Sequence, residues 1–226
     1  MEHEVVARAE SERGEVVVRR RTTMDGEPDG TLELRVNGVF VMDTSETSTE
    51  RRLARACLDA VTSPARVLVG GLGLGYTLRE LVVDPRVEQV VVAEIEPAVV
   101  DWMRAGVVPG ADLLDDPRVW VVVGDVQRLV RHAPTASYDV LLLDVDNGPD
   151  FLVYDANAAV YAAPFLAECA RLLAGGGALT VWSSTRSGAL EAALREVFGG
   201  CHAEPVSVDL QGRSEQYWLL TSRMET

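Results

Sequence analysis

Cysteine and histidine are scarce in this sequence, with three of each among 226 residues. The three cysteines, Cys57, Cys169 and Cys201, are odd in number and far apart, which argues against a disulfide framework and favours a reducing compartment. Neither they nor the three histidines have the spacing of metal ligands. We therefore expect no metal site.

Long apolar runs are absent as well. No segment approaches the roughly 20 apolar residues of a membrane span, and the N-terminal residues lack the basic and apolar regions of a signal peptide. These absences predict a cytoplasmic protein. The formal net charge of −14 disfavours nucleic acids and anionic membranes as partners, but acids gathered at one site would attract a cationic ligand.

The most informative segment is an apolar run, Val67-Leu68-Val69, that breaks into glycines and continues with helical spacing. Gly71, Gly73 and Gly75 lie at this expected strand-to-helix turn. Glycines there permit positive φ and allow backbone N–H groups to approach a ligand. The turn predicts a nucleotide site, although alone it also fits a tight turn without a ligand.

The glycine spacing separates several nucleotide chemistries. A dinucleotide fingerprint is G-x-G-x-x-G, and Tyr76 occupies the place of its third glycine. A bulky side chain at that close helix–strand contact argues against a bound pyrophosphate. No Gly-Lys-Ser or Gly-Lys-Thr follows the turn, so a P-loop is excluded.

Acidic residues follow the next three expected strands. Glu94 ends the strand at about 89–94, Asp125 follows the strand at 119–123, and Asp144 and Asp146 follow the strand at about 139–144. An acid about 20 residues beyond such glycines can accept hydrogen bonds from ribose hydroxyls. Ligands of open α/β sheets bind outside the carboxyl ends of the strands, so we expect these acids to share one site.

Together these residues resemble the spermidine synthase branch of the class I S-adenosylmethionine-dependent transferases. The resemblance runs from about Leu34 to about Trp182. It rests on four segments: the glycine-rich run 70–75, Glu94-Ile95-Glu96, Gly124-Asp125, and the loop Asp144-Val145-Asp146-Asn147-Gly148-Pro149. It implies a Rossmann-like fold and a donor that is S-adenosylmethionine or its decarboxylated form.

The resemblance also implies roles for individual residues. Asp144 would assist deprotonation of an attacking amine, while Glu94 would bind the ribose of the donor. Asp125 and the Val126 backbone would bind its adenine, and Gly71, Gly73 and Gly75 would pass close to its tail. Asp146 and Tyr154 are the candidate acceptor contacts, and Tyr161 is a further candidate.

Two departures from the family pattern bear on the substrate. Many spermidine synthases carry an acid between the last two glycines, where this chain has Leu74. The usual tyrosine-containing polyamine motif is also missing, which leaves Glu46 and Glu50 as candidate amine contacts. Three hypotheses remain: an aminopropyltransferase acting on an amine, a small-molecule S-adenosylmethionine-dependent methyltransferase, and a non-catalytic nucleoside-binding subunit.

The alternation of elements predicts the fold class, α/β with a mostly parallel seven-stranded sheet. Beyond the three strands above, we expect strands at about 67–70 and 177–183 and a C-terminal antiparallel hairpin around Gln211-Gly212. Helices are expected at about 75–83, 97–105, 126–132 and 163–174, the last ended by Gly175-Gly176-Gly177.

The N-terminal part has a different character from the rest. Residues 1–45 contain alternating β-prone segments and the hairpin signal Asn37-Gly38. They predict a small antiparallel sheet, followed by a nucleoside-binding domain over 46–226. The spacing from Thr47 to Glu50 predicts a capping box at the first helix of that domain. By the family resemblance, the N-terminal sheet covers the site and implies a possible homodimer.

Overall fold

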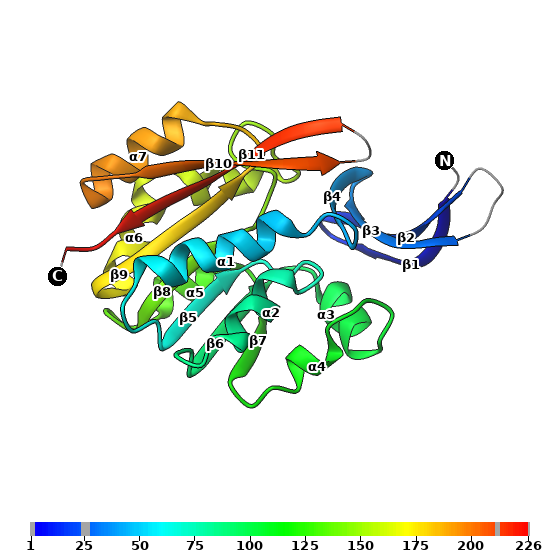
Figure 1. Cartoon of the computed structure of the whole chain (residues 1–226), viewed down its shortest axis with the longest axis horizontal. Coiled ribbons are helices and arrows are strands. Elements are labelled where there is room, and N and C mark those ends of the chain that lie inside the picture. Colours follow the sequence, from blue (N-terminus) through cyan, green and yellow to red (C-terminus); the bar gives the residue numbers. More distant parts are fainter. Residues whose placement is uncertain (1–2, 24–27, 211–212, 226) are drawn as a thin grey trace.

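The computed structural model describes residues 3–23, 28–210 and 213–225. Its larger sheet has seven strands in the order β10-β11-β9-β8-β5-β6-β7 (Figure 1). The strand bounds are β5 Arg66–Gly70, β6 Gln89–Glu94, β7 Val119–Val123, β8 Tyr138–Leu143, β9 Leu173–Ser183, β10 His202–Leu210 and β11 Arg213–Arg223. Strands β5 to β9 pair in parallel, whereas β11 pairs antiparallel with β9 and with β10.

Helices cover both faces of this sheet, and the apolar core consists of two clusters. The helices are α1 Ser48–Ala60, α2 Tyr76–Val83, α3 Pro97–Arg104, α4 Ala111–Leu114, α5 Val126–His132, α6 Ala163–Leu172 and α7 Gly188–Phe198, with a 3₁₀ helix η1 at Asp155–Tyr161. One core cluster receives apolar side chains from α1 to α4, and the other receives them from α5 to α7. The arrangement confirms the expected Rossmann-like class I methyltransferase fold with its C-terminal antiparallel hairpin.

The N-terminal residues form the expected small antiparallel sheet. Its strands are β1 His3–Ser11, β2 Gly14–Thr22, β3 Pro28–Val36 and β4 Val39–Asp43. Asn37 and Gly38 both have positive φ, of 51° and 77°, as the hairpin turn between β3 and β4 requires. Val16, Val18 and Leu34 join the same core cluster as α1 and α2, so this sheet packs directly on the larger unit.

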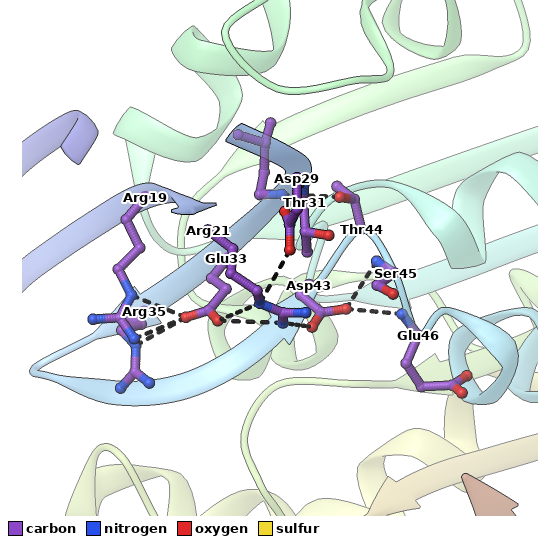
Figure 2. Close-up of polar contacts among 11 residues, drawn as sticks. Arg19, Arg21, Asp29, Thr31, Glu33, Arg35, Asp43, Thr44, Ser45 and Glu46 are labelled. Carbon is purple, nitrogen blue, oxygen red and sulfur yellow. Dashed lines mark hydrogen bonds and ion pairs between the residues drawn. The ribbon is translucent and has the colours of Figure 1, made fainter. Parts of the chain in front are cut away.

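An ionic network holds the connection from the small sheet to α1 in place. Arg21 Nη2 contacts Asp43 Oδ2 at 2.7 Å and Glu33 Oε1 at 3.3 Å (Figure 2). The other oxygen of Asp43 accepts hydrogen bonds from the backbone N–H groups of Ser45 and Glu46, at 2.9 and 2.8 Å. Because Asp43 ends β4, the network fixes where α1 begins.

Three local expectations differ from the structure. Strand β9 begins at Leu173, so Gly175 to Gly177 lie inside this strand and do not follow the helix. At α1 the N-cap Thr47 makes no side-chain capping bond, and its hydroxyl accepts from Arg51 Nε at 3.2 Å. The Glu50 side chain accepts from the Thr49 hydroxyl. Helix α4 and η1 were not predicted from the sequence. The Gln211-Gly212 turn lies outside the described residues.

Candidate active site

The N-terminal sheet adjoins the larger unit at the edge where β5, β6 and β8 end (Figure 1). One pocket is lined by residues from both sides of this junction. Residues of β3 and β4 form its roof. We call it the main pocket; its lining is Leu34, Val36, Val41, Met42, Glu50, Gly71, Leu72, Gly73, Tyr76, Thr77, Ala93, Glu94, Ile95, Glu96, Val99, Gly124, Asp125, Val126, Asp144, Val145, Asp146, Asn147, Val153, Tyr154, Asn157 and Trp182. Eight of the nine residues expected at the site therefore line this pocket, and Gly75 is the exception.

The glycine turn follows β5 and runs along one wall of the main pocket. Gly71 has φ 98°, and a Cβ on it would lie 2.0 Å from the carbonyl oxygen of Asp144. The turn after β5 can therefore approach the end of β8 only without a side chain at this position. Gly73 also lines the pocket, but Gly75 does not: it is the left-handed N-cap of α2, with φ 83°.

Glu94 lies at the end of β6 and is 7% exposed. Its Oε2 accepts from the backbone N–H of Leu72 at 2.9 Å, and its Oε1 accepts from that of Glu96 at 2.8 Å. Burial raises the pKa of this carboxyl. The two hydrogen bonds fix the carboxylate against the glycine turn, and each oxygen retains a lone pair that can face a ligand.

The acid after β7 serves first as a helix cap. Asp125 accepts a hydrogen bond from the Gln127 backbone N–H at 2.8 Å and thereby begins α5. Asp125 and Val126 also line the main pocket, as do the apolar side chains of Ile95 and Val99. This end of the pocket combines apolar walls with one acceptor at its edge, which suits a flat heteroaromatic ring with an exocyclic amine.

Asp144 directly follows β8, where its backbone N–H donates to the carbonyl of Gly70 at 2.8 Å. Within the described part of the chain, its carboxylate has no hydrogen-bond or ion-pair partner. Burial, and then the negative charges of Glu50 and Glu94, raise the pKa of Asp144 to about 8. A carboxyl group with this pKa can accept a proton from an amine near neutral pH.

Glu50 from α1 is a further acid of the main pocket that no described cation pairs with. It is 9% exposed and accepts a hydrogen bond from the Thr49 hydroxyl at 2.9 Å. Burial raises the pKa of Glu50 to about 7. Of the two candidate amine contacts on this segment, Glu50 thus lies in the pocket. Glu46 instead accepts from the Ser48 backbone N–H at the start of α1.

Asp146 organises the loop after β8. Its two oxygens accept from the backbone N–H groups of Asn147, Val153 and Tyr154 and from the side-chain amide of Asn157, at 2.8, 2.7, 3.3 and 2.8 Å. This loop carries Tyr154 into the main pocket. The four bonds occupy the acceptor capacity of Asp146.

Arg13 links the N-terminal sheet to the pocket wall, a link that the sequence did not indicate. It lies in the turn between β1 and β2, and its Nε donates to Glu96 Oε1 at 2.7 Å while its Nη2 donates to the Ile95 carbonyl at 2.7 Å. The Tyr154 hydroxyl donates to the same Glu96 oxygen at 3.1 Å. One buried carboxylate thus joins the hairpin tip, the end of β6 and the loop after β8.

Two other residues weighed from the sequence lie outside the main pocket. Leu74 is 2% exposed and belongs to the core, and Tyr161 is 5% exposed at the end of η1.

In the described ranges, no group of three or more His, Cys, Asp and Glu side chains is arranged to hold a metal. Every helix there is too short or too polar to cross a bilayer.

A doubly wound sheet with a glycine turn and acids at its carboxyl edge is typical of transferases with the class I methyltransferase fold, and ligands of such open sheets bind outside this edge. A family model described as the spermine/spermidine synthase domain matches residues 46–191. The chain therefore belongs to the spermine/spermidine synthase family.

Curated relatives match part of the chain. A polyamine aminopropyltransferase of Mycobacterium tuberculosis is 40% identical over 126 residues, or 54% of this chain and 23% of the relative. A spermine synthase of Arabidopsis thaliana is 32% identical over 143 residues, 62% of this chain and 38% of the relative. A putrescine N-methyltransferase of Nicotiana tabacum is 32% identical over 122 residues, which are 53% of this chain and 30% of the relative. The matches thus span less than two fifths of these relatives.

Solved structures support the fold over nearly the whole chain. A spermidine synthase crystallised with a transition-state analogue superposes with a TM-score of 0.83 at 19% identity, covering 97% of this chain and 73% of that one. The spermidine synthase of Thermotoga maritima superposes with a TM-score of 0.79 at 18% identity, covering 97% of this chain and 72% of that one. The small N-terminal sheet is included in this likeness.

Proposed function

We propose that this chain is an aminopropyltransferase that moves an aminopropyl group from decarboxylated S-adenosylmethionine to an amine. The observation that carries the proposal is the Asp144 carboxylate, which has no partner among the described residues and shares the main pocket with the glycine turn and the acids of β6 and β7. Membership of the spermine/spermidine synthase family supports the same conclusion.

The lining of the main pocket fits an adenosyl sulfonium. Glu94, held in place by two backbone N–H groups, would accept hydrogen bonds from the ribose hydroxyls. Ile95 and Val99 would contact the adenine ring, with Asp125 accepting from its amino group beside the Val126 backbone. Gly71 and Gly73 would pass close to the sulfonium, whereas Gly75 would act indirectly by starting α2.

When bound, the sulfonium donor supplies an electrophilic carbon and a neutral thioether leaving group. The amine nitrogen forms a bond to that carbon of the aminopropyl group, and the carbon–sulfur bond breaks with its electron pair going to sulfur. Asp144 takes the proton that the amine loses. The pocket holds the reactants in line, which supplies much of the acceleration.

Glu50 offers a carboxylate that can replace the acid missing at Leu74. The aminopropyl tail of the decarboxylated donor carries an ammonium and no carboxylate. Glu50 is buried and unpaired among the described residues, and it lines the main pocket beside Tyr76 and Thr77 of α2, next to the glycine turn. A buried carboxylate there favours a cationic tail over a zwitterionic one. Tyr154, by contrast, would border the acceptor, while Asp146 would shape its loop.

Calorimetric titration tests this assignment of the donor. We expect decarboxylated S-adenosylmethionine and methylthioadenosine to bind, and S-adenosylmethionine to bind more weakly than its decarboxylated form. Glu50→Gln should reduce that preference, whereas Glu46→Gln, just outside the pocket, should retain it. Preference for S-adenosylmethionine would favour methyl transfer, and binding of none of the three would overturn the proposal.

Three broader expectations accompany the proposal. They are a boundary between two domains near residue 45, a homodimer and a cytoplasmic location. Light scattering of the purified chain tests the homodimer, and expression of residues 46–226 alone tests whether the larger domain folds without the N-terminal sheet. Because Val16, Val18 and Leu34 share a core with α1, we expect that truncation to lower the melting temperature.

A further inference from the structure

A second hollow continues the main pocket toward the molecular surface. Strands β4, β9 and β11 and the loop after β8 form it, and we call it the outer groove; its lining is Val39, Phe40, Val41, Asn147, Phe151, Leu152, Trp182, Ser184 and Tyr217. Val41, Asn147 and Trp182 also line the main pocket. A ligand that reaches Asp144 through this groove would thus contact both sets of residues.

The outer groove has no acid to receive a second ammonium. None of its lining residues carries a carboxylate. Two loop acids neighbour lining residues in the sequence: Asp146 accepts four hydrogen bonds from its own loop, and Asp150 accepts one from the Thr185 hydroxyl at 2.9 Å. The acids of the main pocket, Glu50 and Asp144 included, do not line the groove. An ammonium in the groove would lose hydration without gaining an anionic partner among the lining residues.

Apolar and aromatic side chains dominate the groove instead. Trp182 is 8% exposed, and its ring meets that of Tyr217 edge to face at 4.9 Å. The Trp182 indole N–H is buried and has no hydrogen-bond partner among the described residues. Trp182 lines both hollows, so its ring offers an apolar surface to a ligand that reaches from one into the other.

Large apolar side chains remain exposed at the groove. Phe151 of the loop after β8 is 60% exposed and Val39 of β4 is 42% exposed. These residues come from two different segments and line the same groove. Exposed apolar surface next to a binding pocket is typical of a surface that a ligand covers.

We propose that the outer groove binds an apolar, ring-sized arm of the acceptor, so that the acceptor is a primary amine with an aromatic or branched alkyl end and not a short diamine. This inference rests on the proposed function, because it places the amine end of the acceptor at Asp144. It concerns the part of the acceptor that does not react.

The test compares two amines by titration calorimetry on protein saturated with methylthioadenosine. We expect 3-phenylpropylamine to bind about tenfold more tightly than 1,4-diaminobutane, because burying a ring contributes at least that factor. Phe151→Ser should weaken binding of the aromatic amine several-fold and leave the diamine unaffected. Val83→Ser removes another exposed apolar side chain, at the far end of α2, and should change neither affinity.

Several results would overturn the inference. Tighter binding of the diamine would do so, since it would show that the rings hold an ammonium by cation–π contact. So would binding of neither amine, or an unchanged affinity in Phe151→Ser. The proposed function is judged separately, by transfer from the decarboxylated donor. If methylthioadenosine does not bind, that function fails, and the amine titrations on the protein alone decide the inference by the same criterion.

Discussion

Replacing Asp144 with asparagine should change how the stability of the protein depends on pH. The carboxylate of Asp144 has no partner among the described residues, and its pKa is raised from 3.8 to about 8 in the folded protein. Between these two values the folded state binds more protons than the unfolded state, so stability falls as pH rises. Asparagine has the same shape and does not ionise.

The size of the effect follows from the shift. One group of this kind changes the free energy of unfolding by at most about 1.4 kcal/mol per pH unit within the window. Asp144 is only partly buried at the pocket wall, so we expect less than this maximum. As pH rises from about 5 to about 7.5, the free energy of unfolding of Asp144→Asn should increase relative to that of the wild type by about 1 to 3 kcal/mol.

Urea unfolding at several pH values measures this difference. Asp112→Asn is the matched control, because Asp112 is exposed and a hydrogen bond from Arg79 lowers its pKa. The control curve should run parallel to that of the wild type above about pH 5. If the curve of Asp144→Asn also ran parallel, Asp144 would titrate normally and could not act as a base near neutral pH.

Three further changes test other parts of the site. Arg13→Gln removes a 2.7 Å ion pair and should raise the Kd for methylthioadenosine about 3- to 10-fold, whereas Arg8→Gln, in an exposed pair of the same hairpin, should leave it unchanged in calorimetry. Asp146→Ala removes four hydrogen bonds and should speed amide hydrogen exchange in residues 147–157 about tenfold or more. Gly71→Ala places a Cβ 2.0 Å from the Asp144 carbonyl and should lower the free energy of unfolding by several kcal/mol in urea titration, well above the roughly 1 kcal/mol of an ordinary Gly→Ala change at positive φ.

The sequence predicted the layered fold because local signals decide it. Apolar runs at 67–69 and 141–143 became buried strands, and Asn37-Gly38 formed the turn that its φ angles require. The glycine run at 175–177 was misjudged, since β9 begins earlier and pairs with β8 across a register shift. Strand pairing overrode the usual reading of glycine as a helix end.

The sequence predicted the acids of the site, but it did not predict the contacts between segments that are far apart in the chain. Glu94 and Asp144 were found because they end strands that meet at one edge. Arg13 and its partner Glu96 are 83 residues apart in the sequence, and no local pattern indicates that they meet. Likewise, Glu50 has the spacing of a capping residue, and only the packing of α1 against α2 turns it into the pocket.

The most direct measurement is product analysis after a single turnover with decarboxylated S-adenosylmethionine and an acceptor amine, using wild type and Asp144→Asn. We predict release of methylthioadenosine and an aminopropylated amine from the wild type. In the variant we predict donor binding unchanged and transfer slowed about 10²-fold or more. An equal rate in the variant would remove Asp144 from the mechanism. A methylated amine formed only from S-adenosylmethionine would contradict aminopropyl transfer.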